Sequence, residues 1–156
     1  MSRPAPPPDL RIARIHALPE GLGALRAAAA AEGFRFLDRL AADWTSGETR
    51  FDAPGEALFA AWRGGALVAI GGVTRDPWAG AAPEPSRTGR LRRFYVHPSA
   101  RRRGVGAALL AELIAAARPH FTRLRLRTDE SAAAFYAALG FAQTAEPGAT
   151  HARPLD

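Results

Sequence analysis

The chain contains no cysteine and no lysine, and its hydrophobic residues form no long uninterrupted run. Without cysteine there is no disulfide bond, no thiolate metal ligand and no cysteine nucleophile. Without lysine there is no catalytic ε-amine and no ε-amino group to modify, because all 21 basic residues are arginine. No apolar run reaches the ~18 residues that cross a bilayer. The N-terminal segment MSRPAPPPDL also lacks the apolar centre of a signal peptide. We therefore expect a cytoplasmic protein that has no membrane partner.

The remaining composition indicates one globular domain. Hydrophobic residues make up 47% of the 156 residues, a proportion typical of folded proteins of a size that can bury a substantial core. We expect residues 1–8, which are rich in proline, to form a disordered tail, and residues 9–156 to form the domain. The four histidines are scattered without the spacing of metal ligands, so no metal site is expected. We expect a monomer or a homodimer.

Hydrophobic periodicity predicts an α/β fold in three layers. Alternating apolar residues predict strands at 10–17, 56–62, 66–74, 91–96, 121–128, 141–145 and 150–155. Helical spacing predicts helices at 22–31, 34–44, 105–117 and 131–139. In the strand at 121–128, Leu124 and Leu126 are expected to face the core. Arg123, Arg125 and Arg127 are expected to face outward.

The most informative segment is LRRFYVHPSARRRGVGAALL, residues 91–110. A strand ends at Val96, a helix begins near Val105, and the loop between them is rich in arginine and glycine. Glycine lets the backbone approach a ligand closely, and the free N–H groups of a first helical turn bind anions. The loop therefore predicts a pyrophosphate site. A P-loop is excluded because no Gly-Lys-Ser/Thr is present, and the dinucleotide fingerprint is excluded because Leu109 stands where it needs glycine.

The spacing Arg101-x-x-Gly104-x-Gly106 after a strand resembles the acetyl-CoA-binding motif of the GNAT superfamily of N-acetyltransferases. A second block, DESAAAFYAALGF at 129–141, is similar to a later motif of that family, in which a helix carries Phe-Tyr and ends at Gly-Phe. The two blocks occur in the family's order. The resemblance implies the acyl-CoA N-acyltransferase fold, which has three α/β/α layers and a central mixed, mostly antiparallel sheet. It also implies acetyl-CoA as co-substrate and no metal.

The resemblance implies contacts with acetyl-CoA for Phe94, Tyr95, Val96, Arg101, Arg102, Arg103, Gly104, Val105, Gly106 and Asp129. The backbone of residues 94–96 would pair with the pantetheine amides and polarise the thioester carbonyl. The N–H groups of residues 102–106 would hold the pyrophosphate, and Arg101 and Arg103 would add charge-assisted bonds. The hydroxyl of Tyr136 would lie near the sulfur and protonate the departing thiolate.

Asp129 stands where the family often has asparagine. It can accept a bond from a pantetheine amide or cap the following helix, and capping is the favoured interpretation. No general base stands out among Glu84, His97 and Glu130. Arg92 could contact an acidic acceptor, and Trp78 could line an acceptor pocket.

We therefore expect transfer of an acetyl group from acetyl-CoA to a primary amine by direct attack in a ternary complex. The amine belongs to a small molecule or a peptide, and its identity and the use of other acyl groups stay open. A non-catalytic acyl-CoA sensor of the same fold is one alternative. The other is a basic nucleic-acid-binding module. Its cationic surface would comprise Arg90, Arg92, Arg93, Arg101, Arg102, Arg103, Arg123, Arg125 and Arg127.

Overall fold

The computed structural model describes residues 7–80 and 84–155. They form one seven-stranded sheet in the order β1-β2-β3-β4-β5-β7-β6. The strands are β1 Leu10–Arg14, β2 Ala57–Arg63, β3 Ala66–Arg75, β4 Thr88–Val96, β5 Arg123–Leu126, β6 Ala142–Gln143 and β7 His151–Pro154. Only β4 and β5 pair in parallel, and every other neighbouring pair is antiparallel.

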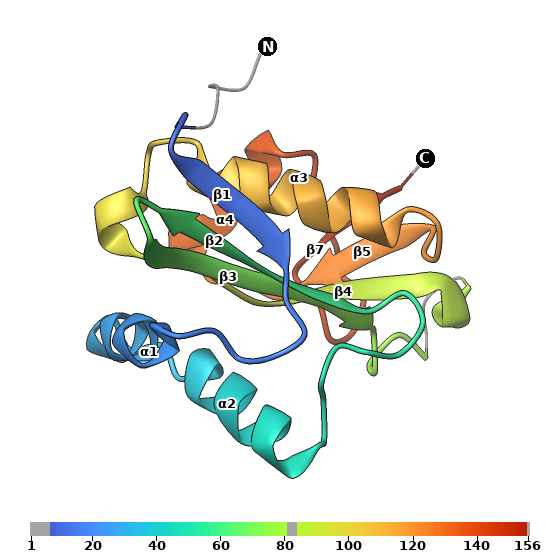
Figure 1. The fold of residues 1–156 in the computed structure, drawn as a ribbon. Helices are drawn as coiled ribbons and strands as arrows, with labels where there is room; N and C mark the ends of the chain where they lie inside the picture. Colours follow the sequence, from blue (N-terminus) through green and yellow to red (C-terminus); the bar gives the residue numbers. More distant parts are fainter. Residues whose placement is uncertain (1–6, 81–83, 156) are drawn as a thin grey trace.

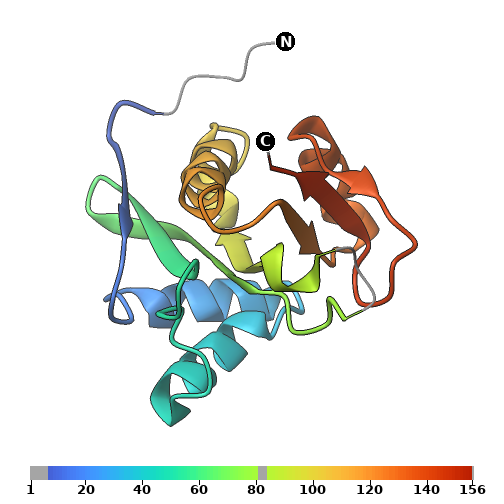
Figure 2. The same ribbon diagram turned by 90° about the vertical axis from the view of Figure 1, so that its right-hand side faces the viewer.

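Four helices cover the two faces of this sheet (Figure 1). They are α1 Leu22–Ala31, α2 Phe36–Ser46, α3 Val105–Ala117 and α4 Glu130–Ala138. One core cluster joins α3 and α4 to one face, and a second joins α1 and α2 to the other. Figure 2 shows the two helical layers from the side. The three-layer α/β/α architecture with a mixed, mostly antiparallel sheet is thus confirmed.

Short turns fix the ends of the elements. Gly64 and Gly65 have φ angles of 55° and 84°, so the β2–β3 hairpin closes on the glycine pair that the sequence marks. Helices α1 and α3 have the predicted bounds. The strands at both ends of the chain are shorter than expected, and α2 begins two residues later than predicted. The expected tail at 1–8 lies outside the described residues except for Pro7 and Pro8.

The expectation that Arg125 faces outward is wrong. Its side chain is 1% exposed, and its Nε donates to Asp76 Oδ2 at 2.7 Å. Arg90 on the neighbouring strand is also buried and donates to the carbonyl of Gly148 at 2.8 Å. Strand alternation does place Arg125 away from the α3 layer, but the loops after β3 and before β7 cover it. The nucleic-acid interpretation therefore loses two of its cationic surface residues.

A β-bulge interrupts β4 at the point where the sheet opens. Arg92 pairs with Gly72 and Tyr95 with Ile70, so two residues of β4 face the single residue Gly71. Arg93 is the extra residue and has a φ of 57°. The bulge shifts the alternation, which leaves Arg92 and Arg93 on the α2 side of the sheet and Phe94 on the α3–α4 side.

Strands β4 and β5 separate just before this bulge. Their parallel pairing covers only Thr88 to Arg90 of β4, so the edge of β4 from residue 91 to residue 96 has no strand beside it. Backbone amide groups there are available to an extended ligand. Among the residues described, no helix is both long and apolar enough to span a bilayer.

Candidate active site

The arginine–glycine loop presents unpaired backbone donors at the start of α3. Arg102 and Gly104 have φ angles of 63° and 80°, left-handed conformations that turn the chain sharply. No side chain caps the helix, and its first return bond runs from Ala108 N to the carbonyl of Gly104 at 3.0 Å. Within the described residues, the N–H groups of residues 105–107 therefore have no acceptor. Such a helix start suits a bound anion.

The end of β4 lies against this helix start. The N–H of His97 donates to the carbonyl of Val68 at 2.7 Å, toward β3. Because successive residues of a strand turn their amide groups to opposite edges, the N–H of Val96 faces the open side left by β5. This position suits an extended amide ligand and places an N–H where a carbonyl oxygen can be polarised.

Gly106 brings the two sequence motifs into contact. A Cβ atom at this position would lie 3.1 Å from the ring of Phe135 and 3.4 Å from Val96. The start of α3, the end of β4 and the middle of α4 therefore meet at a point where a larger residue would crowd them. The structure thus places Val96, Gly106 and the Phe135–Tyr136 pair side by side.

Tyr136 sits in an aromatic cage on α4. Its ring packs edge-on against Phe94, Phe135 and Phe141 at centroid distances of 6.2, 5.1 and 5.8 Å. The residue is 7% exposed, and burial, followed by the charge of Asp129, raises the pKa of its hydroxyl. No described residue bonds that hydroxyl. It therefore stays protonated at neutral pH and is available as a donor.

Arg101 is held by a carboxylate that the sequence does not point to. Its guanidinium forms two bonds with Glu32, of 2.6 and 2.8 Å, and its Nε donates to the carbonyl of Val96 at 3.0 Å. The hydroxyl of buried Tyr95 donates to the same carboxylate at 2.5 Å. Glu32 ends α1, so this cluster ties the α1–α2 layer to the end of β4. Arg102 and Arg103 are exposed and form no side-chain bond with any described residue.

Charges set the protonation states in this cluster. The bonds from Arg101, and next those from Tyr95, lower the pKa of Glu32. Burial, and next the bond to Glu32, raises the pKa of Tyr95 to about 12. Glu32 is thus a fully engaged anion and not a free base.

The other candidate residues lie in different surroundings. Asp129 caps α4, since its Oδ1 accepts from Ala132 N at 3.3 Å and from Ser131 Oγ at 2.6 Å. His97 uses Nδ1 to accept from Ser99 N at 3.1 Å. Glu84 precedes the end of β4 opposite to Val96, and this nine-residue strand is about 25 Å long at the usual rise. Glu130 is exposed in the first turn of α4.

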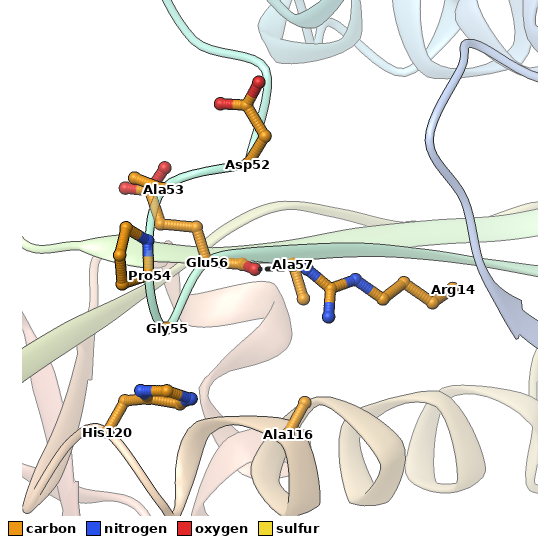
Figure 3. A pocket seen from close by; sticks show the side chains of 9 residues that line it. All are labelled: Arg14, Asp52, Ala53, Pro54, Gly55, Glu56, Ala57, Ala116 and His120. Atoms are coloured by element: carbon orange, nitrogen blue, oxygen red, sulfur yellow. Dashed lines mark hydrogen bonds between the residues drawn. The ribbon is translucent and has the colours of Figure 1, made fainter.

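A surface hollow lies away from these residues (Figure 3). It has a volume of about 310 Å³ and is lined by Arg14, Glu56 and His120 among others. Ala116 lies in the last turn of α3 and His120 just after the helix, and a 13-residue helix is about 20 Å long. This hollow is therefore separate from the start of α3 with its unpaired N–H groups. No cluster of three or more metal-ligating side chains occurs in the described part of the chain.

Comparisons with known proteins agree with this geometry. A profile of the acetyltransferase (GNAT) family matches residues 24–141. A solved structure from Exiguobacterium sp. 255-15, described as an acetyltransferase, is 32% identical, with a TM-score of 0.81 over 94% of this chain and 93% of that one. None of the curated protein sequences matches the chain significantly.

More distant structures share the fold. A GNAT-family protein from Desulfovibrio desulfuricans is 21% identical, with a TM-score of 0.72 over 94% of this chain and 99% of that one. N-acetylglutamate synthase from Neisseria gonorrhoeae, solved with coenzyme A and N-acetylglutamate, is 15% identical, with a TM-score of 0.64 over 94% of this chain and 35% of that one. On the match of the family profile and the similarity to the Exiguobacterium protein, this chain belongs to the GNAT family of acetyltransferases.

Proposed function

We propose that this protein transfers the acetyl group of acetyl-CoA to a primary amine in a ternary complex, without an acyl-enzyme. The observation that carries the proposal is the pairing of an uncapped α3 start with an unpaired edge of β4. The start of α3 suits a pyrophosphate, and the edge of β4 suits an extended chain of amides. Coenzyme A contains both groups. The Neisseria relative, of the same fold, was solved with coenzyme A.

The residues fit acetyl-CoA in the following roles. The N–H groups of residues 102–106 hold the pyrophosphate, and the side chains of Arg102 and Arg103 add positive charge from the exposed side of the loop. Backbone groups of residues 94–96 pair with the pantetheine. Asp129, which is occupied as a helix cap, has an oxygen left to accept from a ligand N–H. Arg101 acts on the site through its bonds to Glu32 and to the carbonyl of Val96.

The chemistry requires few protein groups. The amine nitrogen attacks the thioester carbon, and the Val96 N–H stabilises the negative charge that develops on the carbonyl oxygen. The C–S bond then breaks, Tyr136 donates its proton to the sulfur, and water restores it. The proton lost by the amine leaves through water. The products are an N-acetylated amine and coenzyme A.

Ligand-induced thermal stabilisation tests the co-substrate. Acetyl-CoA and CoA should raise the melting temperature while NAD at the same concentration should not, because a ligand that binds only the native state stabilises it. Arg103→Glu should weaken acetyl-CoA binding by about 10- to 100-fold, since it removes a charge-assisted bond and adds a repulsive charge. Arg118→Glu is the matched control, because it changes the same charge at the other end of α3.

Three outcomes decide between the functions. An equal rise with all polyanions, and equal effects of the two variants, would contradict an acetyl-CoA site and favour a general basic surface. Binding without thiol release in the presence of any amine would favour the sensor. Thiol release that depends on an added amine supports transfer.

A further inference from the structure

Arg92 is a half-buried cation without an anionic partner. It lies on β4, directly before the bulge, and its guanidinium carbon is 5.4 Å from the centre of the Trp78 indole. Within the described residues it makes no hydrogen bond and no ion pair. This distinguishes it from its neighbours Arg90 and Arg93, which are both paired.

The carboxylates around Arg92 are already engaged. Asp43 on α2 accepts from Arg93 at 3.2 Å. Asp76 is fully buried and accepts from Arg125 at 2.7 Å.

Glu56 is the third nearby carboxylate, and it accepts from the backbone N–H of Arg75 at 3.2 Å. Burial, followed by the charge of neighbouring Arg90, lowers the pKa of Arg92, although an arginine stays charged at any working pH. Its charge is therefore only partly compensated by the protein.

The side chain faces a part of the surface that is still open. Trp78, which forms one wall beside it, is 52% exposed. Helices α1 and α2 lie under the β2–β4 part of the sheet, and no described helix covers the same face of β5 and β7 (Figures 1 and 2). The loops after β3 and before β7 cover Arg90 and Arg125 on this face, whereas Arg92 keeps part of its surface exposed, so a ligand can reach it beside Trp78.

The position of Arg92 relative to the place of acetyl transfer indicates a role for this cation. Arg92 precedes Phe94 by two residues on the strand whose open edge is assigned to pantetheine. Regular alternation after Leu91 leaves Arg92 on the α2 side, and the bulge then returns Phe94 to the α3–α4 side, where Tyr136 also lies. An acceptor entering from the α2 side would therefore meet a guanidinium on the same strand as the Val96 N–H that is assigned to the acetyl carbonyl, about 13 Å before it at the usual rise of a strand.

We propose that the acceptor is a primary amine that also carries a carboxylate or a phosphate group, and that Arg92 binds this anionic group. The proposal rests on the proposed acetyl transfer and specifies its acceptor class. A planar guanidinium binds a carboxylate or a phosphate through two parallel hydrogen bonds, and the indole of Trp78 shields these bonds from water.

Matched acceptor pairs test the proposal. Each pair consists of an amino acid and its amide, or an aminoalkyl phosphate and the corresponding amino alcohol, over a series of chain lengths. Transfer is followed by thiol release in the wild type, Arg92→Gln and Arg92→Lys. Arg118→Gln, an exposed arginine at the end of α3, is the control. The same pairs are tested for thermal stabilisation in the presence of CoA, which requires no turnover.

The wild type should prefer the anionic member of a pair, and Arg92→Gln should raise the KM for that member by about 10- to 100-fold without changing the KM for acetyl-CoA. Arg92→Lys should restore part of the preference. The carboxylate and phosphate series show which anion the site accepts. Equal use of anionic and neutral members by wild type and Arg92→Gln would overturn the acceptor class while leaving acetyl transfer intact.

Failure of the proposed function gives a different result. In that case acetyl-CoA neither binds nor reacts, and stabilisation by the anionic compounds still reports on Arg92. Stabilisation that Arg92→Gln abolishes would support the anion site, and stabilisation that it leaves unchanged would contradict it.

Discussion

Replacing Glu32 by glutamine should destabilise the protein, although Glu32 lies at the surface end of α1. The carboxylate accepts from the hydroxyl of Tyr95, which is 3% exposed, and from both terminal nitrogens of Arg101. Glutamine keeps a neutral acceptor for the hydroxyl but presents an amide N–H₂ to the guanidinium. Glu32→Gln therefore weakens one buried charged bond and disrupts one ion pair.

The magnitude follows from the two contributions. A hydrogen bond to a charged group contributes about 1.5–3 kcal/mol and a neutral one about 1 kcal/mol. The Arg101–Glu32 pair is 40% and 30% exposed at its two side chains, so it adds only about 0–1 kcal/mol. We expect the free energy of unfolding to fall by about 2 kcal/mol, which lowers the melting temperature by about 4–8 °C for a chain of this size.

Urea unfolding at neutral pH measures this change. Glu48→Gln is the matched control, because it removes the same charge from an exposed side chain that bonds no described residue, and its effect should stay within about 0.5 kcal/mol. Tyr95→Phe should lose about 1–2 kcal/mol, and the double variant should lose less than the sum, since the two side chains share a bond. Equal urea midpoints for the Glu32 and Glu48 variants would refute the reasoning.

The difference in the free energy of unfolding between the wild type and Glu32→Gln should depend on pH, with a sign that follows from the pKa of Glu32. Arg101, and next Tyr95, lowers the pKa of Glu32 below its ordinary value of 4.5. A lowered carboxyl pKa contributes stability that is present above the ordinary pKa and is lost as the pH falls through the lowered one. The difference between the wild type and Glu32→Gln should therefore be constant above about pH 5.5 and shrink progressively below about pH 4.5. A difference that grows in acid would contradict the assignment.

Three further predictions concern the site and its support. Tyr136→Phe should lower kcat at least about 100-fold with the KM for acetyl-CoA and the melting temperature unchanged, and an unchanged kcat at every pH would remove Tyr136 from the mechanism. Asp76→Asn should lower the free energy of unfolding in urea by about 3–5 kcal/mol, because it leaves Arg125 buried without its carboxylate; a loss below about 1 kcal/mol would show that the loop carbonyls suffice. Gly71→Ala should lower it by about 1–3 kcal/mol, since the new Cβ would lie 2.7 Å from the ring of Phe94, and wild-type stability would mean that this ring moves freely.

Local signals predict the helices and the position of the arginine–glycine loop before α3. Helix α3 has the predicted bounds because Gly104 supplies the left-handed residue at its start and apolar residues recur at helical spacing up to Ala117. The loop was found because glycine and arginine combine within six residues. These features depend on residues close together in the sequence, which is why one sequence suffices to find them.

The features that the sequence does not predict depend mostly on contacts between residues far apart in the chain. The alternation of the strand correctly predicts that Arg125 faces away from α3. It carries no information on which residues cover the other face. Asp76, the carboxylate that pairs with Arg125 there, lies 49 residues away in the sequence. Glu32 follows an alanine-rich helix and lies 69 residues before Arg101, its partner in the structure. The bulge at Arg93 was missed because an arginine with a positive φ has no local signature.

In our proposal, the bulge also explains how one strand serves two ligands. In a regular strand Arg92 and Phe94 would face the same side, because side chains two residues apart share a face. The extra residue at Arg93 breaks this relation and places Phe94 with Tyr136 on the α3–α4 side and Arg92 on the α2 side. In our proposal the thioester and the amine then approach β4 from different layers and meet where β5 has separated from it. The unpaired edge of β4 and Arg92, which has no anionic partner among the described residues, thus lie on either side of the same local irregularity.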